Sequence, residues 1–237
     1  MINLQQVRVG YGKTPLFPPL SGRFTTGSLT AVIGGNGAGK STLLKTLAGL
    51  LPAQGGTLSI SANDIQAIGY LPQQAELDRQ FPIVVSDVVA MGCRRQCGMF
   101  GGLTRLARQQ IAAALATVGM ETMAHVSVGE LSGGQLQRVL FARLLVQQAS
   151  LILLDEPFTG IDRATTQLLL QVIAQLHRQG NTIIAVLHDM AMVAEHFPEA
   201  LLLTPARYVW GSADSVLTHL PPIPIPVTAM SQEEEKQ

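Results

Sequence analysis

The chain has 237 residues, which is enough for one large α/β domain with its own hydrophobic core. Its 16 Lys and Arg residues balance 16 Asp and Glu residues, so the composition argues against the broad basic surface of a nucleic-acid-binding protein. Only 14% of the residues are charged and 47% are hydrophobic, which predicts exposed apolar area that a partner covers, although a core rich in Leu and Ala would give the same totals.

No apolar stretch reaches the ~20 residues that a membrane-spanning helix needs, since the most apolar runs, residues 151–154 and 183–187, have the length of strands. The amino-terminal residues lack the basic segment, apolar core and cleavage site of a secretory signal. Cys93 and Cys97 do not make a disulfide framework and fit reduced thiols. We therefore expect a cytosolic protein that does not itself cross a membrane.

The first predicted elements are a strand over residues 2–9 and a strand over Leu29–Ile33, a short β-branched run that ends at a cluster of glycines. Residues 40–51 follow with a helical period, whose apolar face comprises Leu43, Leu44, Leu47 and Leu50. A strand, a glycine loop and a helix thus follow one another directly, as they do around a phosphate-binding loop.

Residues 82–148 are expected to be helical, without strands. One apolar face comprises Leu106, Ile111, Leu115 and Val118, and another comprises Leu136, Val139, Leu140 and Leu144. We interpret this segment as a helical subdomain that is inserted into a core formed by residues 1–81 and 149–215.

A second alternation follows, with a strand over residues 151–154, a helix over residues 165–179 that Gly180 caps, and a strand over residues 182–187. The apolar stripe of that helix comprises Leu168, Leu169, Val172, Ile173 and Leu176. Strands that alternate with helices predict a mainly parallel sheet. Residues 216–237, which are rich in proline and then polar, are expected to be a flexible tail beyond a single domain of residues 1–215.

The glycine loop meets the P-loop pattern with Gly34, Gly35, Asn36, Gly37, Ala38, Gly39, Lys40, Ser41 and Thr42. Glycines let backbone N–H groups turn toward phosphate oxygens, and the start of a helix adds a favourable dipole. Lys40 would reach the terminal phosphates, and Ser41 would coordinate Mg²⁺. We therefore predict that the chain binds ATP together with Mg²⁺.

Asp155 and Glu156 follow an apolar strand at its carboxyl end, where open α/β sheets bind their ligands. Acidic residues in such a position are often only helix caps, but a neighbouring P-loop gives them a specific chemistry. Asp155 would hold Mg²⁺ through water, and Glu156 would polarise the water that attacks the γ-phosphate.

A second glycine motif stands at a second helix start and comprises Ser132, Gly133, Gly134 and Gln135. Ser132 is suited to cap the helix, and the glycines let backbone donors approach a phosphate. An ordinary capped helix explains an isolated motif of this kind equally well. With the P-loop and the acid pair in the same chain, however, the segment resembles the signature sequence of ABC ATPases, and the resemblance extends over about residues 1–215.

Further residues match that family in order, and the resemblance gives each a role. Tyr11 corresponds to an aromatic residue that stacks on adenine, Gln73 to a glutamine that senses Mg²⁺ and the attacking water, and His188 to a histidine that contacts the γ-phosphate. Asp162 corresponds to the loop that crosses to an opposing subunit. Taken singly, Tyr11 would be a turn or core aromatic and His188 a structural histidine, so the order of the motifs supports both assignments.

The resemblance implies a RecA-like P-loop NTPase core with a mainly parallel sheet, an antiparallel β edge and the inserted helical subdomain. It also implies a dimer, in which each ATP lies between the P-loop of one copy and residues 132–135 of a second copy. Pairing with a paralogue in place of a second copy stays open. Binding and hydrolysis of ATP would drive a polytopic membrane permease from the cytoplasmic face of the membrane.

Three stretches, residues 71–78, 81–92 and 158–162, are similar to those in the ATPases of bacterial zinc, manganese and iron importers. This similarity favours import of a metal ion, with zinc or manganese first, and an extracytoplasmic binding protein that delivers it. Iron or iron-chelate import, an exporter and a soluble ABC switch protein stay open as alternatives.

The chain departs from the family pattern in a few places. Gly35 stands where proline is usual, which should be tolerated because the backbone donors remain. Arg79, Gln80 and the loop of residues 93–102 also differ from the metal-importer pattern. Cys93 and Cys97 are not expected to form a metal site, because two thiolates fall short of the four ligands of a structural zinc site.

Overall fold

The computed structural model describes residues 1–11, 14–61, 68–73, 82–93 and 102–220. Its central feature in these ranges is a six-stranded sheet with the order β11-β10-β5-β9-β8-β7. The strands are β5 (Leu29–Ile33), β7 (Ile68–Leu71), β8 (Leu151–Asp155), β9 (Thr182–Val186), β10 (Glu199–Leu203) and β11 (Tyr208–Ser212). Neighbours run parallel except β10 and β11, which pair antiparallel. The expected mainly parallel sheet is confirmed.

The three central strands β5, β9 and β8 are buried at every residue. Parallel strands that are covered on both faces carry continuous apolar runs, and this is why all three are visible in the sequence. Because they are parallel, their carboxyl ends meet at one edge of the sheet. The glycine loop, the acid pair and the segment around His188 therefore all begin at that edge.

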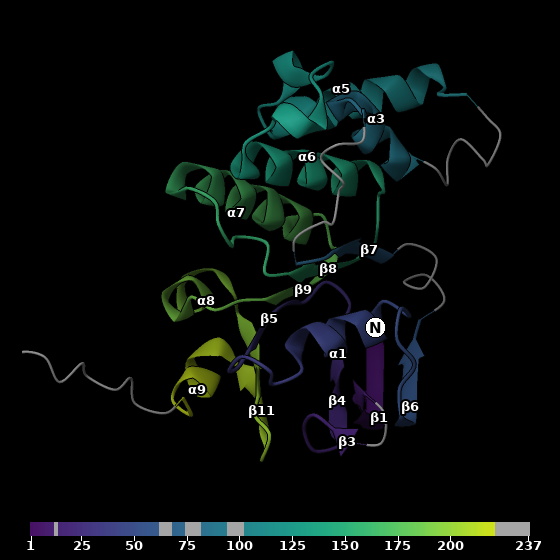
Figure 1. Cartoon of the computed structure of the whole chain (residues 1–237). Helices are drawn as coiled ribbons and strands as arrows, with labels where there is room; N and C mark the ends of the chain where they lie inside the picture. The colour runs from purple at the N-terminus through teal and green to yellow at the C-terminus, as the bar shows by residue number, and fades with distance from the viewer. Residues whose placement is uncertain (12–13, 62–67, 74–81, 94–101, 221–237) are drawn as a thin grey trace, which may run out of the picture.

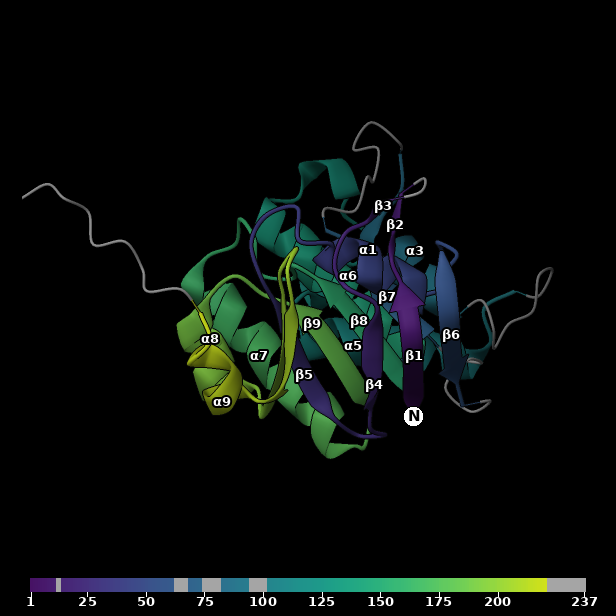
Figure 2. The ribbon, with the colours of Figure 1, turned by 90° about the horizontal axis from the view of Figure 1, so that it is seen from below.

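A second, antiparallel sheet with the order β4-β1-β6 lies beside the central sheet, and helix α1 (Lys40–Leu47) lies between the two (Figures 1 and 2). Its strands are β1 (Ile2–Arg8), β4 (Leu20–Phe24) and β6 (Gly55–Ile60), and a short ribbon of β2 (Gly10–Tyr11) and β3 (Thr14–Pro15) follows β1. Leu43, Leu44 and Leu47 of α1 join the core between the two sheets. The antiparallel β edge of the predicted fold is therefore present.

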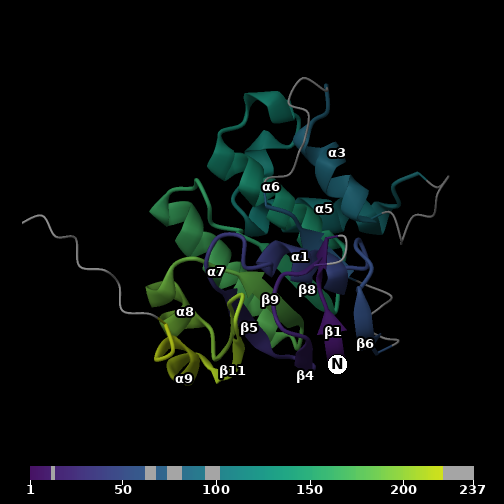
Figure 3. The same ribbon diagram turned by 60° about the horizontal axis from the view of Figure 1, so that its bottom comes forward.

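Helices cover the opposite face of the central sheet (Figures 1 and 3). They are α3 (Val85–Ala90), α5 (Arg105–Thr117), α6 (Gly133–Val146), α7 (Arg163–Arg178), α8 (Met190–His196) and α9 (Ala213–Leu217), with 3-10 turns η1 (Met91–Cys93), η2 (Glu121–Met123) and η3 (Val128–Glu130). Helix α6 packs against both α3 and α5. In Figure 1 these three helices lie together above the sheet, with α6 next to α7, and we refer to them as the helical layer.

Leu50 does not lie on the buried face of α1, as the helical period predicted, but is 60% exposed. Helix α1 ends at Leu47, four residues before the predicted end, and Gly49 has a φ of 73°. A residue with positive φ turns the chain out of the helix. The leucines before the turn therefore stay in the core, and Leu50 points to solvent.

Leu106 is likewise 62% exposed, although it was predicted to share a face with Ile111. The buried face of α5 includes Ala107, Ile111 and Leu115, which follow one another at intervals of four. Leu106 and Ile111 are five positions apart, which turns their side chains about 140° from one another around a helix. Leu106 and Ile111 therefore cannot lie on the same face of the helix, and the predicted face was wrong at Leu106.

The packed fold also continues past residue 215, where the tail was predicted to begin. Helix α9 crosses this position and buries Val216, and Leu217 and Leu220 pack against the core. Residues 221–237, Cys97, Arg79 and Gln80 lie outside the described residues, and Cys93 is buried in η1. Within the part of the chain that the structure describes, no helix is long and apolar enough to cross a membrane.

Candidate nucleotide site

The glycine loop connects β5 to α1 and depends on its glycines for its shape. Gly37 and Gly39 have φ angles of 78° and 91°, in the left-handed region that favours glycine. Gly34 packs so closely on β10 that an added Cβ would overlap the carbonyl oxygen of Leu203. Gly35, Asn36 and Gly37 are exposed, and Ala38, Gly39 and Thr42 are buried at the start of α1. The loop thus opens to solvent at its crest, ahead of the amino end of a helix.

Lys40 folds back over this loop and donates hydrogen bonds from Nζ to the carbonyl oxygens of Gly34 and Gly35, both at 2.9 Å. The side chain is only 6% exposed. Burial lowers the pKa of Lys40, and the nearby carboxylates of Glu156 and Asp155 oppose that shift. A buried ammonium group that is held by neutral carbonyls is suited to bind an anion such as a phosphate.

Asp155 ends β8 and is 1% exposed. Its Oδ1 accepts a hydrogen bond from Ser41 Oγ at 2.8 Å, and its Oδ2 accepts a longer one from Tyr70 Oη at 3.4 Å. Burial raises the pKa of Asp155, and the bond from Ser41 opposes that shift. A carboxylate beside a hydroxyl offers the hard oxygen ligands that Mg²⁺ prefers, so Ser41 and Asp155 fit the predicted ion.

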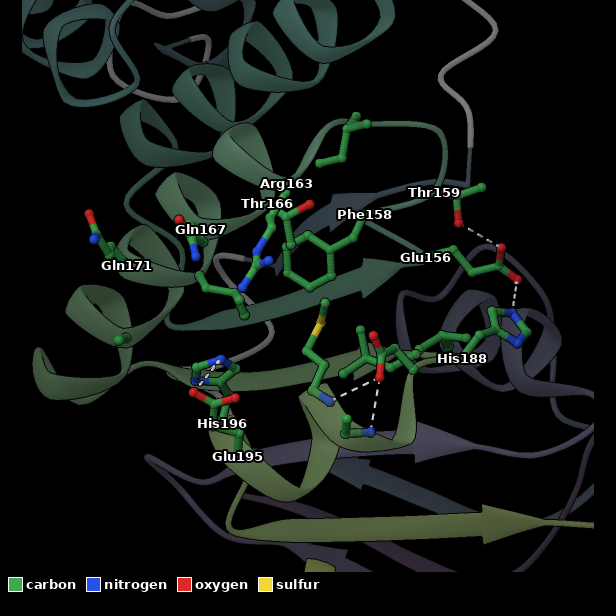
Figure 4. A pocket seen from close by; sticks show the side chains of 18 residues that line it. Glu156, Phe158, Thr159, Arg163, Thr166, Gln167, Gln171, His188, Glu195 and His196 are labelled. Carbon is green, nitrogen blue, oxygen red and sulfur yellow. Dashed lines mark hydrogen bonds and ion pairs between the residues drawn. The ribbon is translucent and has the colours of Figure 1, made fainter. Parts of the chain in front are cut away.

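Glu156 is the centre of a small hydrogen-bond network (Figure 4). His188 Nε2 lies 2.6 Å from Glu156 Oε1, while Gln73 Nε2 and Thr159 Oγ1 donate to Oε2 at 2.8 Å and 3.3 Å. Gln73, Glu156 and His188 follow β7, β8 and β9, which are neighbours in the sheet. Glu156 also has a positive φ of 50°. The ends of three strands therefore converge on one carboxylate.

A groove of about 1000 Å³ begins at this network and runs between α7 and α8. Glu156, Thr159 and His188 line one end of it, and Phe158 and Met192 contribute apolar walls. In Figure 4, Glu195 and His196 lie far along the groove from Glu156. Glu156 therefore lies at one end of this groove.

The second glycine motif begins α6, and its local geometry is that of a capping box. Ser132 Oγ accepts from the backbone N–H of Gln135 at 3.2 Å, and the backbone N–H of Ser132 donates to Gln135 Oε1 at 2.9 Å. Ser132 and Gly133 are exposed. The segment therefore presents a capped helix start to solvent.

Asp162 caps α7 next to this motif. It accepts from the backbone N–H and the hydroxyl of Thr165 at 2.9 Å and 2.8 Å, and these bonds lower the pKa of Asp162. An added Cβ on Gly134 would lie 3.3 Å from Asp162 Oδ2. Arg138 of α6 also donates to Thr165 Oγ1 at 2.8 Å. The structure thus brings the second glycine motif together with Asp162.

Tyr11 lies in β2 and is 60% exposed, which leaves its ring accessible to a stacking ligand. Sequence reasoning missed two residues of this site, Tyr70 and Thr159. Thr159 lies in the loop that follows the acid pair, and its hydroxyl offered a signal. Tyr70 offered little, because an aromatic residue on a strand is usually a core residue.

The family profile of the ABC transporters matches residues 17–159, which is more than half of the chain. The chain belongs to the ABC transporter family. The match includes the P-loop, the second glycine motif and the acid pair, whereas Asp162 and His188 follow its end. The family profile therefore does not cover Asp162 and His188, and the structure shows where they lie.

Two relatives of this chain are named as ATP-binding proteins of metal transport systems. It is 38% identical over 221 residues to the manganese transport system ATP-binding protein MntB of Bacillus subtilis (strain 168), with 92% of this chain and 88% of the relative covered. It is 37% identical over 224 residues to the zinc transport system ATP-binding protein TroB of Treponema pallidum (strain Nichols), with 92% and 83% covered.

A solved structure supports the same fold. It is an inward-facing ABC transporter that is assigned to the metal-chelate type. One of its chains superposes with a TM-score of 0.81 at 28% identity, over 91% of this chain and 84% of that chain. The P-loop NTPase fold of the ABC ATPases is therefore shown for this chain.

Proposed function

We propose that this protein is the ATP-binding and hydrolysing subunit of an ABC transporter that imports a metal ion, with zinc or manganese as the favoured cargo. The observation that supports hydrolysis most directly is the position of Glu156, which Gln73, Thr159 and His188 hold beside the buried Asp155. A binding module without catalysis would need no second carboxylate in such a network.

In the proposed reaction, Lys40 and the backbone N–H groups of residues 34–42 bind the phosphates of ATP. Ser41, and Asp155 through water, would hold Mg²⁺, which would supply positive charge beside the phosphate oxygens. Glu156 orients a water molecule and accepts its proton as the oxygen attacks the γ-phosphorus. The bond from that phosphorus to the bridging oxygen breaks, and ADP and phosphate leave.

His188 and Gln73 act on Glu156 in this proposal. The contact of 2.6 Å between His188 Nε2 and Glu156 Oε1 keeps that carboxylate turned toward the carboxyl edge of the sheet. Gln73 donates to the other oxygen, so movement of the chain after β7 would change the orientation of the base. Residues 71–78, which include Gln73, and residues 81–92 belong to the stretches whose sequence resembles that of metal importers.

The cargo and the partners are inferred from the relatives that are named for manganese and zinc transport. The ATPase would act at the cytoplasmic face of the membrane, as a pair of identical copies bound to a polytopic permease, with an extracytoplasmic protein that delivers the ion. The metal-chelate assignment of the solved transporter favours iron-chelate import as the second candidate. Uptake of radioactive zinc, manganese or iron chelate by vesicles that hold the complex decides among these cargoes.

Exchange of Glu156 for Gln tests the catalytic assignment. Glu156→Gln keeps the size of the side chain but removes the base, so ATP turnover should fall by ~10²–10⁴-fold. ATP affinity should be retained, and size-exclusion chromatography with ATP should show a trapped dimer. Phosphate release and calorimetry measure the two effects.

Lys40→Ala provides the contrast, because it removes the ammonium group that the phosphates would meet. This variant should lose nucleotide affinity, whereas Glu156→Gln should not. Undiminished turnover in Glu156→Gln would refute the role of the carboxylate, and wild-type ATP affinity in Lys40→Ala would refute the role of the loop.

A further inference from the structure

Tyr70 faces the Mg²⁺-binding carboxylate from a neighbouring strand. It lies on β7 directly opposite Leu153 of β8, and Asp155 is two residues further along β8. Residues two apart on a strand point to the same face, so Tyr70 and Asp155 share the face of the sheet that covers α1. The hydroxyl of Tyr70 lies 3.4 Å from Asp155 Oδ2.

The two oxygens of Asp155 are thus held by two different hydroxyl groups, Ser41 at Oδ1 and Tyr70 at Oδ2. A phenol hydroxyl can donate one hydrogen bond, and in this geometry the Tyr70 hydroxyl donates to Asp155 Oδ2. Ser41 is itself a proposed ligand of Mg²⁺. When its oxygen turns to the ion, the bond from Tyr70 is the side-chain contact that still orients Asp155.

We propose that Tyr70 is a positioning residue, which fixes the orientation of Asp155 for Mg²⁺ and leaves proton transfer to Glu156. This inference rests on the proposed function, since it assumes that the site binds ATP with Mg²⁺. Outer hydrogen-bond partners of metal ligands commonly contribute to metal affinity in this way. Tyr70 acts toward the metal in this role and makes no contact with the reacting atoms.

The chain that leaves the same strand also reaches the second carboxylate. Gln73, three residues after Tyr70, donates to Glu156 Oε2. The two contacts are separate, because Tyr70 bonds only to Asp155 and Gln73 only to Glu156 among the described contacts. Loss of the Tyr70 hydroxyl should therefore weaken metal binding without removing the base.

A purely structural role for Tyr70 predicts a different outcome. The ring packs against the core between the two sheets. In a purely structural role, this packing would be the only contribution of Tyr70. Tyr70→Phe separates the two roles, because it keeps the ring and removes only the hydroxyl. If the ring alone matters, the variant should bind metal as the wild type does.

The experiment measures Mn²⁺ binding by electron paramagnetic resonance in the full chain with a non-hydrolysable ATP analogue. Tyr70→Phe should bind Mn²⁺ roughly 10-fold more weakly, at the lower end of the effect of outer partners. Its affinity for the nucleotide without metal should match that of the wild type, and so should its melting temperature. In turnover, the Mg²⁺ concentration for half-maximal rate should rise, with kcat at saturating Mg²⁺ within about 2-fold of the wild type.

Tyr208→Phe is the matched control. Tyr208 lies on β11, at the opposite edge of the sheet from β7, and its hydroxyl accepts from the backbone N–H of Ser21 at 3.3 Å. This variant should leave Mn²⁺ affinity unchanged. Equal Mn²⁺ affinity in Tyr70→Phe and the wild type would overturn the inference alone. A wild-type protein without nucleotide-dependent Mn²⁺ binding would overturn the proposed function and the inference with it.

Discussion

At the scale of single residues, the glycines of the phosphate loop are needed for different reasons. Gly34 needs the absence of a side chain because β10 lies against it, and Gly39 needs a positive φ of 91°. Gly35 needs neither, since no atom of the described residues lies within 4 Å of an added Cβ. This freedom agrees with the proline that usually occupies the position of Gly35 in ABC ATPases.

Gly34→Ala should therefore destabilise the fold. The added methyl group would overlap the carbonyl oxygen of Leu203, and relief would require a backbone shift. Such overpacking costs about 1–3 kcal/mol, which lowers the melting temperature by roughly 2–12 °C in a chain of this size. Differential scanning calorimetry without nucleotide measures the change. Gly35→Ala is the control, and equal melting temperatures for the two variants would contradict the packing argument.

At the scale of elements, the turn η1 packs against helix α6 of the helical layer through a close contact with its backbone. Gly92 of η1 lies so near α6 that an added Cβ would overlap the carbonyl oxygen of Arg143. The same Cβ would lie 2.5 Å from Val146 Cγ2. The packing of η1 against α6 thus depends on a residue without a side chain. This contact joins elements that are distant in the sequence.

Gly92→Ala should separate η1 from α6 and lower the free energy of unfolding by about 1–3 kcal/mol, as overpacked sites do. A urea titration followed by circular dichroism should show an earlier midpoint. Gly102→Ala makes the same chemical change where no atom of the described residues lies within 4 Å of the new Cβ, so its midpoint should match that of the wild type. Parallel shifts in both variants would argue against the contact.

At the scale of the whole molecule, apolar side chains are exposed on the helical layer. Met91, Leu103 and Leu106 lie in or beside η1 and α5 and are exposed. The low fraction of charged residues predicted such a surface, although Leu106 was expected to be buried. If the protein drives a permease, this layer offers apolar area for a partner.

Leu106→Ser should leave the stability of the isolated chain within about 0.5 kcal/mol of the wild type, since exposed positions tolerate such changes. It should weaken binding to the permease by roughly 5-fold or more, the effect of losing an apolar interface contact of about 1 kcal/mol. Affinity for the permease in detergent measures this. Leu50→Ser, after α1 and away from the helical layer, should bind as the wild type does, and an equal loss there would refute the assigned surface.

Much of the site was predictable because its chemistry is local in the chain. Residues 34–42 match the pattern of a phosphate loop, and the acid pair follows an apolar strand. Both features are set by residues that are neighbours in the chain, so the sequence shows them. The roles predicted for Gln73 and His188 came only from a family resemblance. The structure contributes their convergence on Glu156, because that contact joins the ends of three strands.

The sequence by itself determined the alternation of strands and helices, and with it the mainly parallel sheet, because apolar runs and helical periods are set within each segment. Only the tertiary structure decided which side chains face each other across segments. It placed the hydroxyl of Tyr70 on Asp155, brought Gln73 and His188 to Glu156, and packed α9 onto the core. Side chains from different strands meet only when the strands pair, and the pattern within one segment does not specify which distant segment lies beside it.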